Sequence, residues 1–187
     1  MRRGARFILI AAIVLAIVFA LVSCAPTDAA TSPGYVSGDG TVTEWQPGER
    51  PGPVEVSGIA LDGSAVDIAD YRGEVVVLNL WYAACPPCRA EAPELVALDA
   101  LDGVQVVGIN TRDDAATGQA FEQTFGVQYP SILGDDGRAI AALQGLVAVN
   151  AVPTTLVLDA EGNVAARIIG RAEESTFQAL VEGASAS

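Results

Sequence analysis

Cys85 and Cys88, separated by two prolines, are the residues of this chain whose type and spacing could do chemistry. Two thiols at this spacing can form a redox-active pair, bind a metal ion or close a structural disulfide. A zinc or iron–sulfur site requires about four nitrogen or sulfur ligands, and the chain has no histidine and a single further cysteine, Cys24. A structural disulfide that closes so small a loop would remove little chain entropy. We therefore interpret the pair as redox-active and expect no metal site.

The residues around the pair predict a strand followed by a helix. Residues 75–81 (VVVLNLW) form a continuous run of β-branched and apolar side chains, which is typical of a buried strand. Residues 89–101 have the spacing of an amphipathic helix. The cysteines would then lie at the N-terminus of a helix, where unpaired N–H groups and the helix dipole stabilise a thiolate.

Cys85 is predicted to be the attacking sulfur because it would face the helix N-terminus directly. Cys88 would lie one turn inside the helix, be more enclosed and keep the higher pKa, so it would attack the mixed disulfide and release the partner. Pro86 and Pro87 have no N–H to donate, so the Cys85 thiolate would rely on the Cys88 N–H. Both prolines fit a first helical turn, and this intervening pair would also set the redox potential.

The remainder of the chain predicts an α/β domain. Further strands are expected at 54–61, 66–68, 104–109, 154–158 and 164–169, and further helices at 116–125, 138–143 and 173–183. The order is β-α-β-α, a helical insertion, and then β-β-α. It indicates a central mixed sheet with parallel strands at its centre and helices on both faces.

The N-terminal residues 1–23 have the pattern of a secretion signal. Three arginines precede an apolar run over 7–22, and a serine then precedes Cys24. This pattern resembles the lipobox of bacterial lipoproteins, in which the cysteine is lipidated and becomes the mature N-terminus. An uncleaved signal anchor is the alternative. Either arrangement would tether the domain to the extracytoplasmic face of the membrane.

Residues 24–53 are rich in threonine, serine, proline, glycine and alanine and lack apolar periodicity, which predicts a flexible tether. The globular domain is therefore expected at 54–187, a length that suffices for one hydrophobic core, and we expect it to be a monomer. The formal net charge of −13 argues against nucleic-acid binding and against adhesion to anionic headgroups.

The segment 81–89 (WYAACPPCR) looks like the active-site segment of thioredoxin-fold proteins. More closely, the chain is similar to the TlpA/ResA-like family of membrane-anchored, extracytoplasmic thiol–disulfide oxidoreductases. The match includes residues 70–73 (DYRG), 88–93 (CRAEAP), 152–155 (VPTT) and 159–162 (DAEG). The resemblance implies a thioredoxin-like fold with an N-terminal β extension and a helical insertion before the strand that follows a cis-proline.

The resemblance also implies roles for single residues. Pro153 matches the family's cis-proline, which faces the cysteine pair and presents the backbone of Val152 to an incoming chain. Trp81 matches the tryptophan that packs under the active-site loop, and Pro93 matches a proline that kinks the active-site helix. Glu91 falls where the family often has glutamate, although an exposed acid in a first helical turn explains it equally well.

Two positions depart from the thioredoxin pattern. Asn79 stands where cytoplasmic thioredoxins have a buried aspartate that carries protons, and an amide cannot do acid–base work. Many members of the membrane-anchored family share this departure, so deprotonation of Cys88 would fall to water, Glu91 or another acid. Ala84 stands where relatives usually have tryptophan, and its small side chain is expected to open the surface around Cys85.

These features predict an enzyme that exchanges disulfides with protein partners and needs no cofactor. The resemblance implies a reductant, for example in cytochrome c maturation, that receives electrons from a membrane-embedded thiol donor. A thioredoxin-fold thiol peroxidase and a non-enzymatic carrier that binds copper or a partner are the alternatives. The peroxidase usually has a threonine two or three residues before its reactive cysteine, where this chain has Ala83 and Tyr82.

Overall fold

The computed structural model describes residues 35–37, 40–148 and 150–186. The predicted signal segment 1–23 and Cys24 lie outside these residues. The described strands are β1 (Tyr35–Ser37), β2 (Gly40–Glu44), β3 (Ser57–Ile59), β4 (Ala65–Asp67), β5 (Val75–Trp81), β6 (Val104–Asn110), β7 (Ser131–Leu133), β8 (Thr154–Leu158) and β9 (Val164–Ile169). The described helices are the 3₁₀ helix η1 (Ile68–Tyr71), α2 (Pro86–Asp99), α3 (Ala115–Phe125), α4 (Arg138–Ala142) and α5 (Glu174–Ser185). None of these helices has the length and hydropathy needed to cross a bilayer.

Seven of the strands form one mixed sheet in the order β1-β2-β9-β8-β5-β6-β7. β5 lies between β6, to which it is parallel, and β8, to which it is antiparallel. β7 extends the parallel side, and β9, β2 and β1 extend the antiparallel side. The predicted mixed sheet is confirmed. Its parallel strands lie toward one edge rather than at the centre, because β2 and β1 lengthen the other side.

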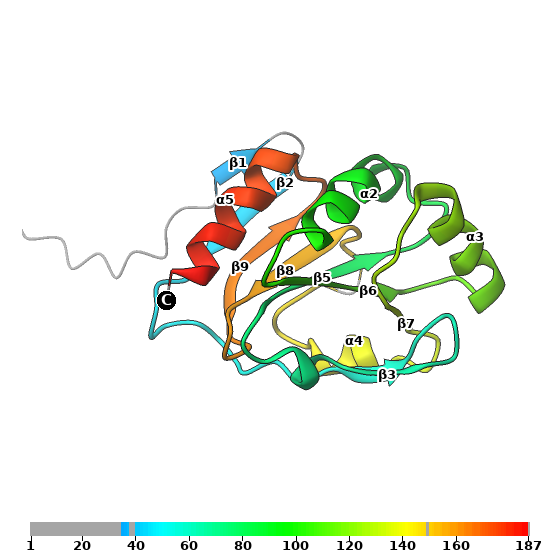
Figure 1. Cartoon of the computed structure of the whole chain (residues 1–187), viewed down its shortest axis with the longest axis horizontal. Coiled ribbons are helices and arrows are strands. Elements are labelled where there is room, and N and C mark those ends of the chain that lie inside the picture. Colours follow the sequence, from blue (N-terminus) through cyan, green and yellow to red (C-terminus); the bar gives the residue numbers. More distant parts are fainter. Residues whose placement is uncertain (1–34, 38–39, 149, 187) are drawn as a thin grey trace, which may run out of the picture. The chain divides into compact units, whose positions relative to one another are not determined.

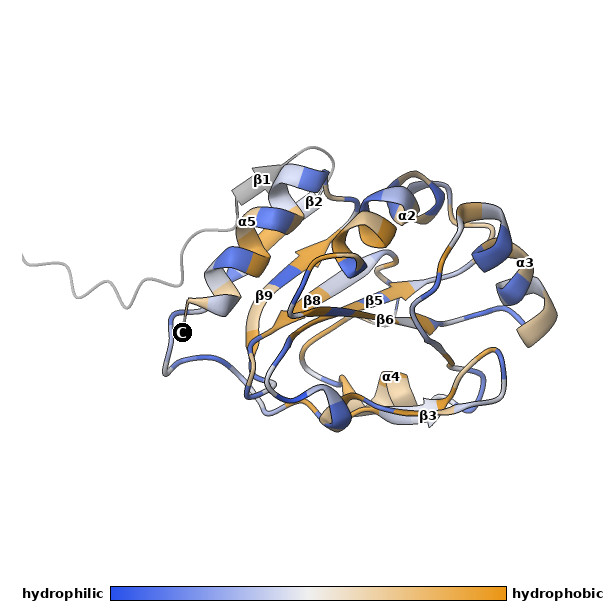
Figure 2. Cartoon of the chain, viewed as in Figure 1, coloured by the Kyte–Doolittle hydropathy of each residue, from blue (hydrophilic) through white to orange (hydrophobic). Residues whose placement is uncertain are grey.

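The residues of β5 alternate between the two faces of the sheet, and all of them are buried. Val77 and Trp81 belong to an apolar cluster that includes residues of α2, α3 and α5. Leu78 and Leu80 belong to a second cluster that includes residues of β4, η1 and α4. Figure 1 shows α2, α3 and α5 on one side of the sheet and α4 with β3 on the other, and Figure 2 shows that much of the sheet between them is coloured as hydrophobic. A continuous apolar run thus forms a strand that is buried on both faces, as predicted.

The helices begin and end close to where the sequence places them. α2 begins at Pro86, three residues before the predicted helix, because Cys85 caps it and prolines occupy its first turn. α3 ends at Phe125, and Gly126 is its C-cap in the left-handed conformation, with φ of 72°. The predicted helical insertion contains α3 and α4, and between them β7 adds an edge strand to the sheet.

The folded domain extends into the predicted tether, residues 24–53, so the predicted domain boundary is wrong. β2 pairs antiparallel with β9, and in this register Val42 lies opposite Ile168 and is 3% exposed. Trp45 donates its backbone N–H to the Ala165 carbonyl at 2.9 Å. Without β2, the backbone groups along one side of β9 would lack strand partners. A short segment rich in glycine and threonine can supply these bonds without showing any apolar periodicity.

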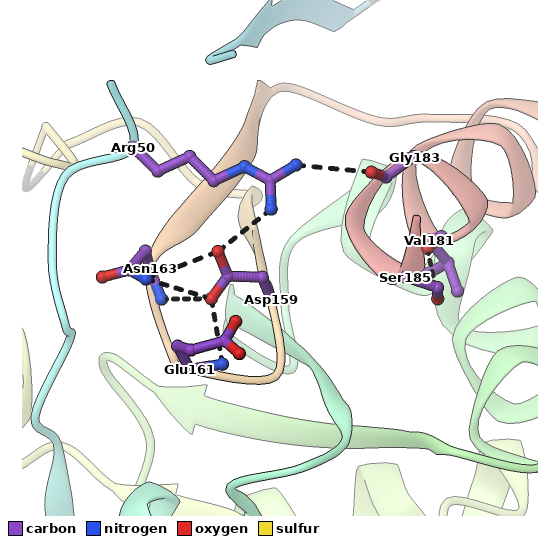
Figure 3. Close-up of polar contacts among 7 residues, drawn as sticks. All are labelled: Arg50, Asp159, Glu161, Asn163, Val181, Gly183 and Ser185. Carbon is purple, nitrogen blue, oxygen red and sulfur yellow. Dashed lines mark hydrogen bonds and ion pairs between the residues drawn. The ribbon is translucent and has the colours of Figure 1, made fainter. Parts of the chain in front are cut away.

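Arg50 connects the segment after β2 to the C-terminal part of the domain (Figure 3). Its Nη1 lies 3.0 Å from Asp159 Oδ2, and its Nη2 donates to the Gly183 carbonyl in α5 at 3.3 Å. Asp159 Oδ1 also accepts the backbone N–H groups of Glu161 and Asn163, at 3.1 and 2.7 Å. Burial pushes the pKa of Asp159 upward, but the hydrogen bonds from Arg50 and Asn163 outweigh burial and hold it below its usual range.

Candidate active site

Cys85 and Cys88 form a disulfide at the N-terminus of α2, with an S–S distance of 2.02 Å. Cys85 is the N-cap residue, and its Sγ accepts the backbone N–H of Cys88 at 3.2 Å. This is the predicted donor, because Pro86 and Pro87 have no N–H. Cys85 therefore lies at the positive end of the helix, where a thiolate is stabilised.

The two cysteines do not differ in exposure. Cys85 is 1% exposed and Cys88 is 2% exposed, so the prediction that Cys88 is the more enclosed is wrong for the disulfide form. Ala84 is exposed, but it does not open the surface around Cys85 as predicted. Tyr82 and Val152 pack against the apolar cluster that contains both cysteines. The position at the helix end, rather than exposure, distinguishes the two sulfurs.

The Val152–Pro153 peptide bond is cis, as the resemblance implied. Pro153 is buried directly before β8, and its carbonyl accepts the Gly170 N–H at 2.9 Å. Val152 is half-buried and contacts the apolar cluster that contains both cysteines. The fold thus packs the residue before the cis-proline against the same apolar cluster as the two cysteines, although they are far apart in the sequence.

Trp81 is 3% exposed and lies in the same apolar cluster as the two cysteines. Its ring centroid is 4.3 Å from that of Phe121 in α3. Gly108 on the neighbouring β6 makes room for the indole, because a Cβ there would come within 2.7 Å of Trp81 Nε1 and 2.6 Å of Ser131 Oγ. Trp81 is therefore a core residue, and its role under the active-site loop stays a prediction.

A carboxylate that the sequence analysis did not single out holds the backbone just before the disulfide. Asp113 Oδ2 accepts the backbone N–H of Ala83 at 2.6 Å and the Nδ2 of Asn110 at 2.8 Å. Asn110 Oδ1 in turn accepts the Asp113 backbone N–H at 2.8 Å. The sequence offered one signal for Asp113. It is a polar residue just after β6, which is parallel to β5, the strand before the cysteines. The carboxyl ends of such strands meet at one edge of the sheet.

Two arginines contact the same segment. Arg89 Nη1 donates to the Ala83 carbonyl at 3.3 Å, and its guanidinium lies 5.0 Å from the ring centroid of Phe125. The guanidinium of Arg112 lies 4.4 Å from the ring centroid of Tyr82. In a chain with a formal net charge of −13, these contacts place positive charge beside the residues that lead into the disulfide.

Glu91 is 1% exposed, which contradicts its interpretation as an exposed acid. Its Oε1 accepts Asn79 Nδ2 at 3.0 Å, and its Oε2 makes no hydrogen bond of ordinary geometry with the described residues. Burial raises the pKa of Glu91 to about 8, although the Asn79 amide and the nearby Ala172 N–H lower it. Glu94 raises this pKa further, and Arg171 opposes that increase. Such a carboxyl can exchange a proton near neutral pH.

The fold and the site define a protein of the thioredoxin-like class. The structure is similar to that of a secreted thiol-disulfide isomerase from Corynebacterium glutamicum, with a TM-score of 0.69 and 30% identity, covering 80% of this chain and 97% of that chain. It is also similar to that of a DsbF homologue from Corynebacterium diphtheriae, with a TM-score of 0.68 and 31% identity, covering 82% of this chain and 99% of that chain. A family model described as Redoxin matches residues 46–181, and the chain belongs to this family.

Curated relatives agree with this assignment. The chain is 32% identical over 115 residues to the thiol:disulfide interchange protein HelX of Rhodobacter capsulatus, which covers 61% of this chain and 63% of HelX. It is 28% identical over 117 residues to the thiol-disulfide oxidoreductase ResA of Bacillus subtilis, with the same two shares. The chain thus spans somewhat less than two thirds of the length of these two relatives.

Proposed function

We propose that the protein is a thiol–disulfide oxidoreductase that exchanges disulfides with protein partners through Cys85 and Cys88. The observation that carries this proposal is the disulfide at the N-terminus of α2, which shares an apolar cluster with Val152, the residue before cis-Pro153. The similarity to HelX, named a thiol:disulfide interchange protein, and to ResA, named a thiol-disulfide oxidoreductase, supports the proposal. The absence of histidine and of further cysteines in the domain removes the usual ligands of a zinc or iron–sulfur site.

In the proposed reductive direction, the Cys85 thiolate attacks one sulfur of the partner's disulfide. A mixed disulfide forms, and the partner's other sulfur leaves as a thiolate. Cys88 then attacks Cys85 Sγ, forms the intramolecular disulfide and displaces the partner's second sulfur as a thiolate. The dithiol is oxidised by two electrons and the partner is reduced by two, while the Cys88 proton passes to a base. Cys85 acts first because the helix N-terminus stabilises its thiolate.

Glu91 is the base that we propose for the Cys88 proton. It follows Cys88 by three residues, so the two side chains lie on the same side of α2. Its carboxyl is buried and has a pKa of about 8, and its Oε2 makes no hydrogen bond of ordinary geometry with the described residues. Asn79, which occupies the place of the thioredoxin aspartate, cannot take the proton.

The residues around the disulfide are proposed to bind and support an extended partner segment. The backbone of Val152 before Pro153 would pair with the segment that carries the partner's cysteine. Trp81 would support the loop from within the core. Pro86 and Pro87 would limit the stabilisation of the Cys85 thiolate, because neither can donate an N–H to it.

We further propose that the protein acts at the extracytoplasmic face of a bacterial membrane as a monomer. A lipid on Cys24, after removal of residues 1–23, would anchor it, with an uncleaved signal anchor as the alternative. A membrane-embedded thiol donor would reduce it, and cysteines of apocytochrome c are one class of substrate. The C. glutamicum relative, described as secreted, supports the location. Mass spectrometry of the mature N-terminus distinguishes the two anchors.

Single-cysteine variants test the proposed activity. Cys85→Ser is expected to abolish the turnover of a model disulfide, and Cys88→Ser is expected to accumulate a mixed disulfide through Cys85. Wild-type turnover in both variants would disprove the proposal. Peroxide consumption without disulfide exchange would instead favour the thiol peroxidase, and copper binding by the reduced protein tighter than micromolar would favour the carrier. Identification of the partner trapped by Cys88→Ser would also give the direction of electron flow.

A further inference from the structure

Asn79 lies in the middle of β5, on the face of the sheet that also carries Val77 and Trp81. It is 1% exposed and lies between Thr155 of β8 and Gly108 of β6 in the register of the sheet. A buried amide in a central strand destabilises the fold unless its polar groups are hydrogen-bonded. The partners of this amide therefore indicate why a polar residue stands in an otherwise apolar strand.

The amide of Asn79 joins the active-site helix to the strand that follows the cis-proline. Its Nδ2 donates to Glu91 Oε1 at 3.0 Å and to Thr155 Oγ1 at 2.9 Å. An amide nitrogen carries two hydrogens, so these two bonds use both. Thr155 lies two residues after Pro153. The amide can therefore hold the carboxyl of Glu91 in a fixed place relative to the disulfide.

We propose that Asn79 is a positioning residue for disulfide exchange, whose amide holds Oε1 of Glu91 and leaves Oε2 for the proton of Cys88. This inference rests on the proposed function, in which Glu91 is the base. Thr155 orients the amide, because its Oγ1 accepts the second N–H. Asparagine suits this place because it donates both hydrogens and takes no proton itself. An aspartate here would put a second acid within hydrogen-bond distance of Glu91.

Other charged and titratable groups also face Glu91, and their effects are smaller or partly cancel. Glu94, on the same helix, raises the pKa of Glu91 and Arg171 lowers it, but these two form an ion pair with each other at 3.2 Å. Tyr129 is buried, and burial first and the charge of Glu91 second raise the pKa of its hydroxyl, so it stays neutral. Among the contacts that lower the pKa of Glu91, the Asn79 hydrogen bond has the largest effect.

Loss of the amide gives a pH shift of known sign. The Asn79 bond stabilises the carboxylate, so Asn79→Leu is expected to raise the pKa of Glu91. Because Glu91 must be ionised to take the Cys88 proton, the midpoint of the Cys88 step moves to higher pH. A rise of one unit lowers the ionised fraction about tenfold at a pH well below the midpoint. Thr155→Val removes only the bond that orients the Asn79 amide, and we expect it to raise the pKa of Glu91 by a smaller amount. Thr155→Ser keeps the hydroxyl, so its midpoints should equal those of the wild type.

Two measurements separate the acid from the thiol chemistry. NMR titration of the Glu91 side-chain carboxyl in the disulfide form gives its pKa while neither Cys85 nor Cys88 titrates. Stopped-flow absorbance follows the reduced protein with one equivalent of dithiobis(nitrobenzoate). One thionitrobenzoate is released when Cys85 attacks and the second when Cys88 attacks the mixed disulfide. The pH profile of the second phase therefore reports the Cys88 step.

Thr154→Val is the matched control for Thr155→Val. Thr154 is also a buried threonine of β8, but its Oγ1 donates to the Ala151 carbonyl at 2.6 Å. Its replacement removes a buried hydroxyl from the same strand without touching Asn79. We expect the Glu91 midpoint and the second-phase midpoint of Thr154→Val to equal those of the wild type.

Upward shifts of both midpoints in Asn79→Leu and Thr155→Val, with recovery in Thr155→Ser, would support the inference. Unshifted midpoints in Thr155→Val and in folded Asn79→Leu would overturn it. If Asn79→Leu does not fold, the three threonine variants decide the question. A wild-type protein that releases no first equivalent would disprove the proposed function and this inference with it. Two-phase release with unshifted midpoints in the variants would disprove the inference alone.

Discussion

Asp159 and Glu91 are both buried carboxyls, at 4% and 1% exposure, and their pKa values move in opposite directions. Asp159 pairs with Arg50 at 3.0 Å and accepts two backbone N–H groups, which outweigh burial and lower its pKa. Glu91 accepts one amide N–H at 3.0 Å, and burial raises its pKa to about 8. The partners, rather than burial alone, decide the charge of a buried acid. Asp159, with an arginine and two backbone N–H groups, keeps its charge, whereas Glu91, whose Oε2 has no hydrogen bond of ordinary geometry among the described residues, is left able to exchange a proton.

Breaking the Arg50–Asp159 pair is the largest effect that we expect. Both side chains are almost fully buried, at 7% and 5% exposure, so Arg50→Met leaves a buried carboxylate without its cation. Such a loss costs about 3 kcal/mol of unfolding free energy. Urea denaturation of the disulfide form measures it. Arg138→Met is the control, because its pair with Asp136 is exposed, and it should change stability by less than about 0.5 kcal/mol. Equal effects of the two variants would contradict the contrast between the pairs.

The second largest effect concerns catalysis at the other acid. Glu91→Gln keeps the size of the side chain but cannot take the Cys88 proton. Loss of a positioned base slows a proton-transfer step by about a hundredfold. The stopped-flow release of the second thionitrobenzoate at neutral pH measures this step, and the first release is expected to change little. If both phases keep wild-type rates, solvent rather than Glu91 takes the proton.

Glu91 and Asp159 should make the unfolding free energy depend on pH in opposite directions. Glu91 titrates near pH 4.5 when unfolded and near 8 when folded, so its contribution is fully present below about 4.5 and is lost as the pH rises through 8. Over that window the unfolding free energy is expected to fall by up to about 1.4 kcal/mol per pH unit. Asp159 contributes above its unfolded value of 3.8, and its contribution is lost as the pH falls through its lowered pKa. Urea titrations of the disulfide forms at several pH values measure both contributions.

Glu91→Gln sharpens this test, because it removes one titrating group and leaves the other. Relative to the wild type, its unfolding free energy should fall less between pH 5 and 8 and should keep the acid-side loss that Asp159 causes. The difference between the two curves isolates the contribution of Glu91. Parallel curves would show that Glu91 has the same pKa in the folded and unfolded states.

The sequence predicts β5 with its observed bounds, because a strand that is buried on both faces requires a continuous apolar run. The apolar spacing of the sequence did not predict the first turn of α2, because Pro86 and Pro87 interrupt this spacing, which is typical of a helix. β2 was missed because hydrogen bonds to β9, rather than side-chain pattern, place it in the sheet. Buried Glu91 receives its hydrogen bond from Asn79, twelve residues away in β5, so this contact depends on how the chain folds and not on local spacing. Local spacing identifies the cysteines, but tertiary packing decides the charge of the acid beside them.

A third carboxyl, Asp113, is less buried than the other two, and its loss should give the smallest effect. It is half-buried and accepts the Ala83 N–H at 2.6 Å and the Asn110 Nδ2 at 2.8 Å. Asp113→Ala removes the acceptor of the Ala83 N–H, and Ala83 lies two residues before Cys85. The substitution should loosen this segment and lower the unfolding free energy by about 1 kcal/mol. We expect kcat/KM for a model disulfide to fall severalfold, while the pH midpoint set by Glu91 stays where it is. A shift of that midpoint would mean that the loop and the buried acid are coupled, and that the acid depends on more of the site than its amide partner.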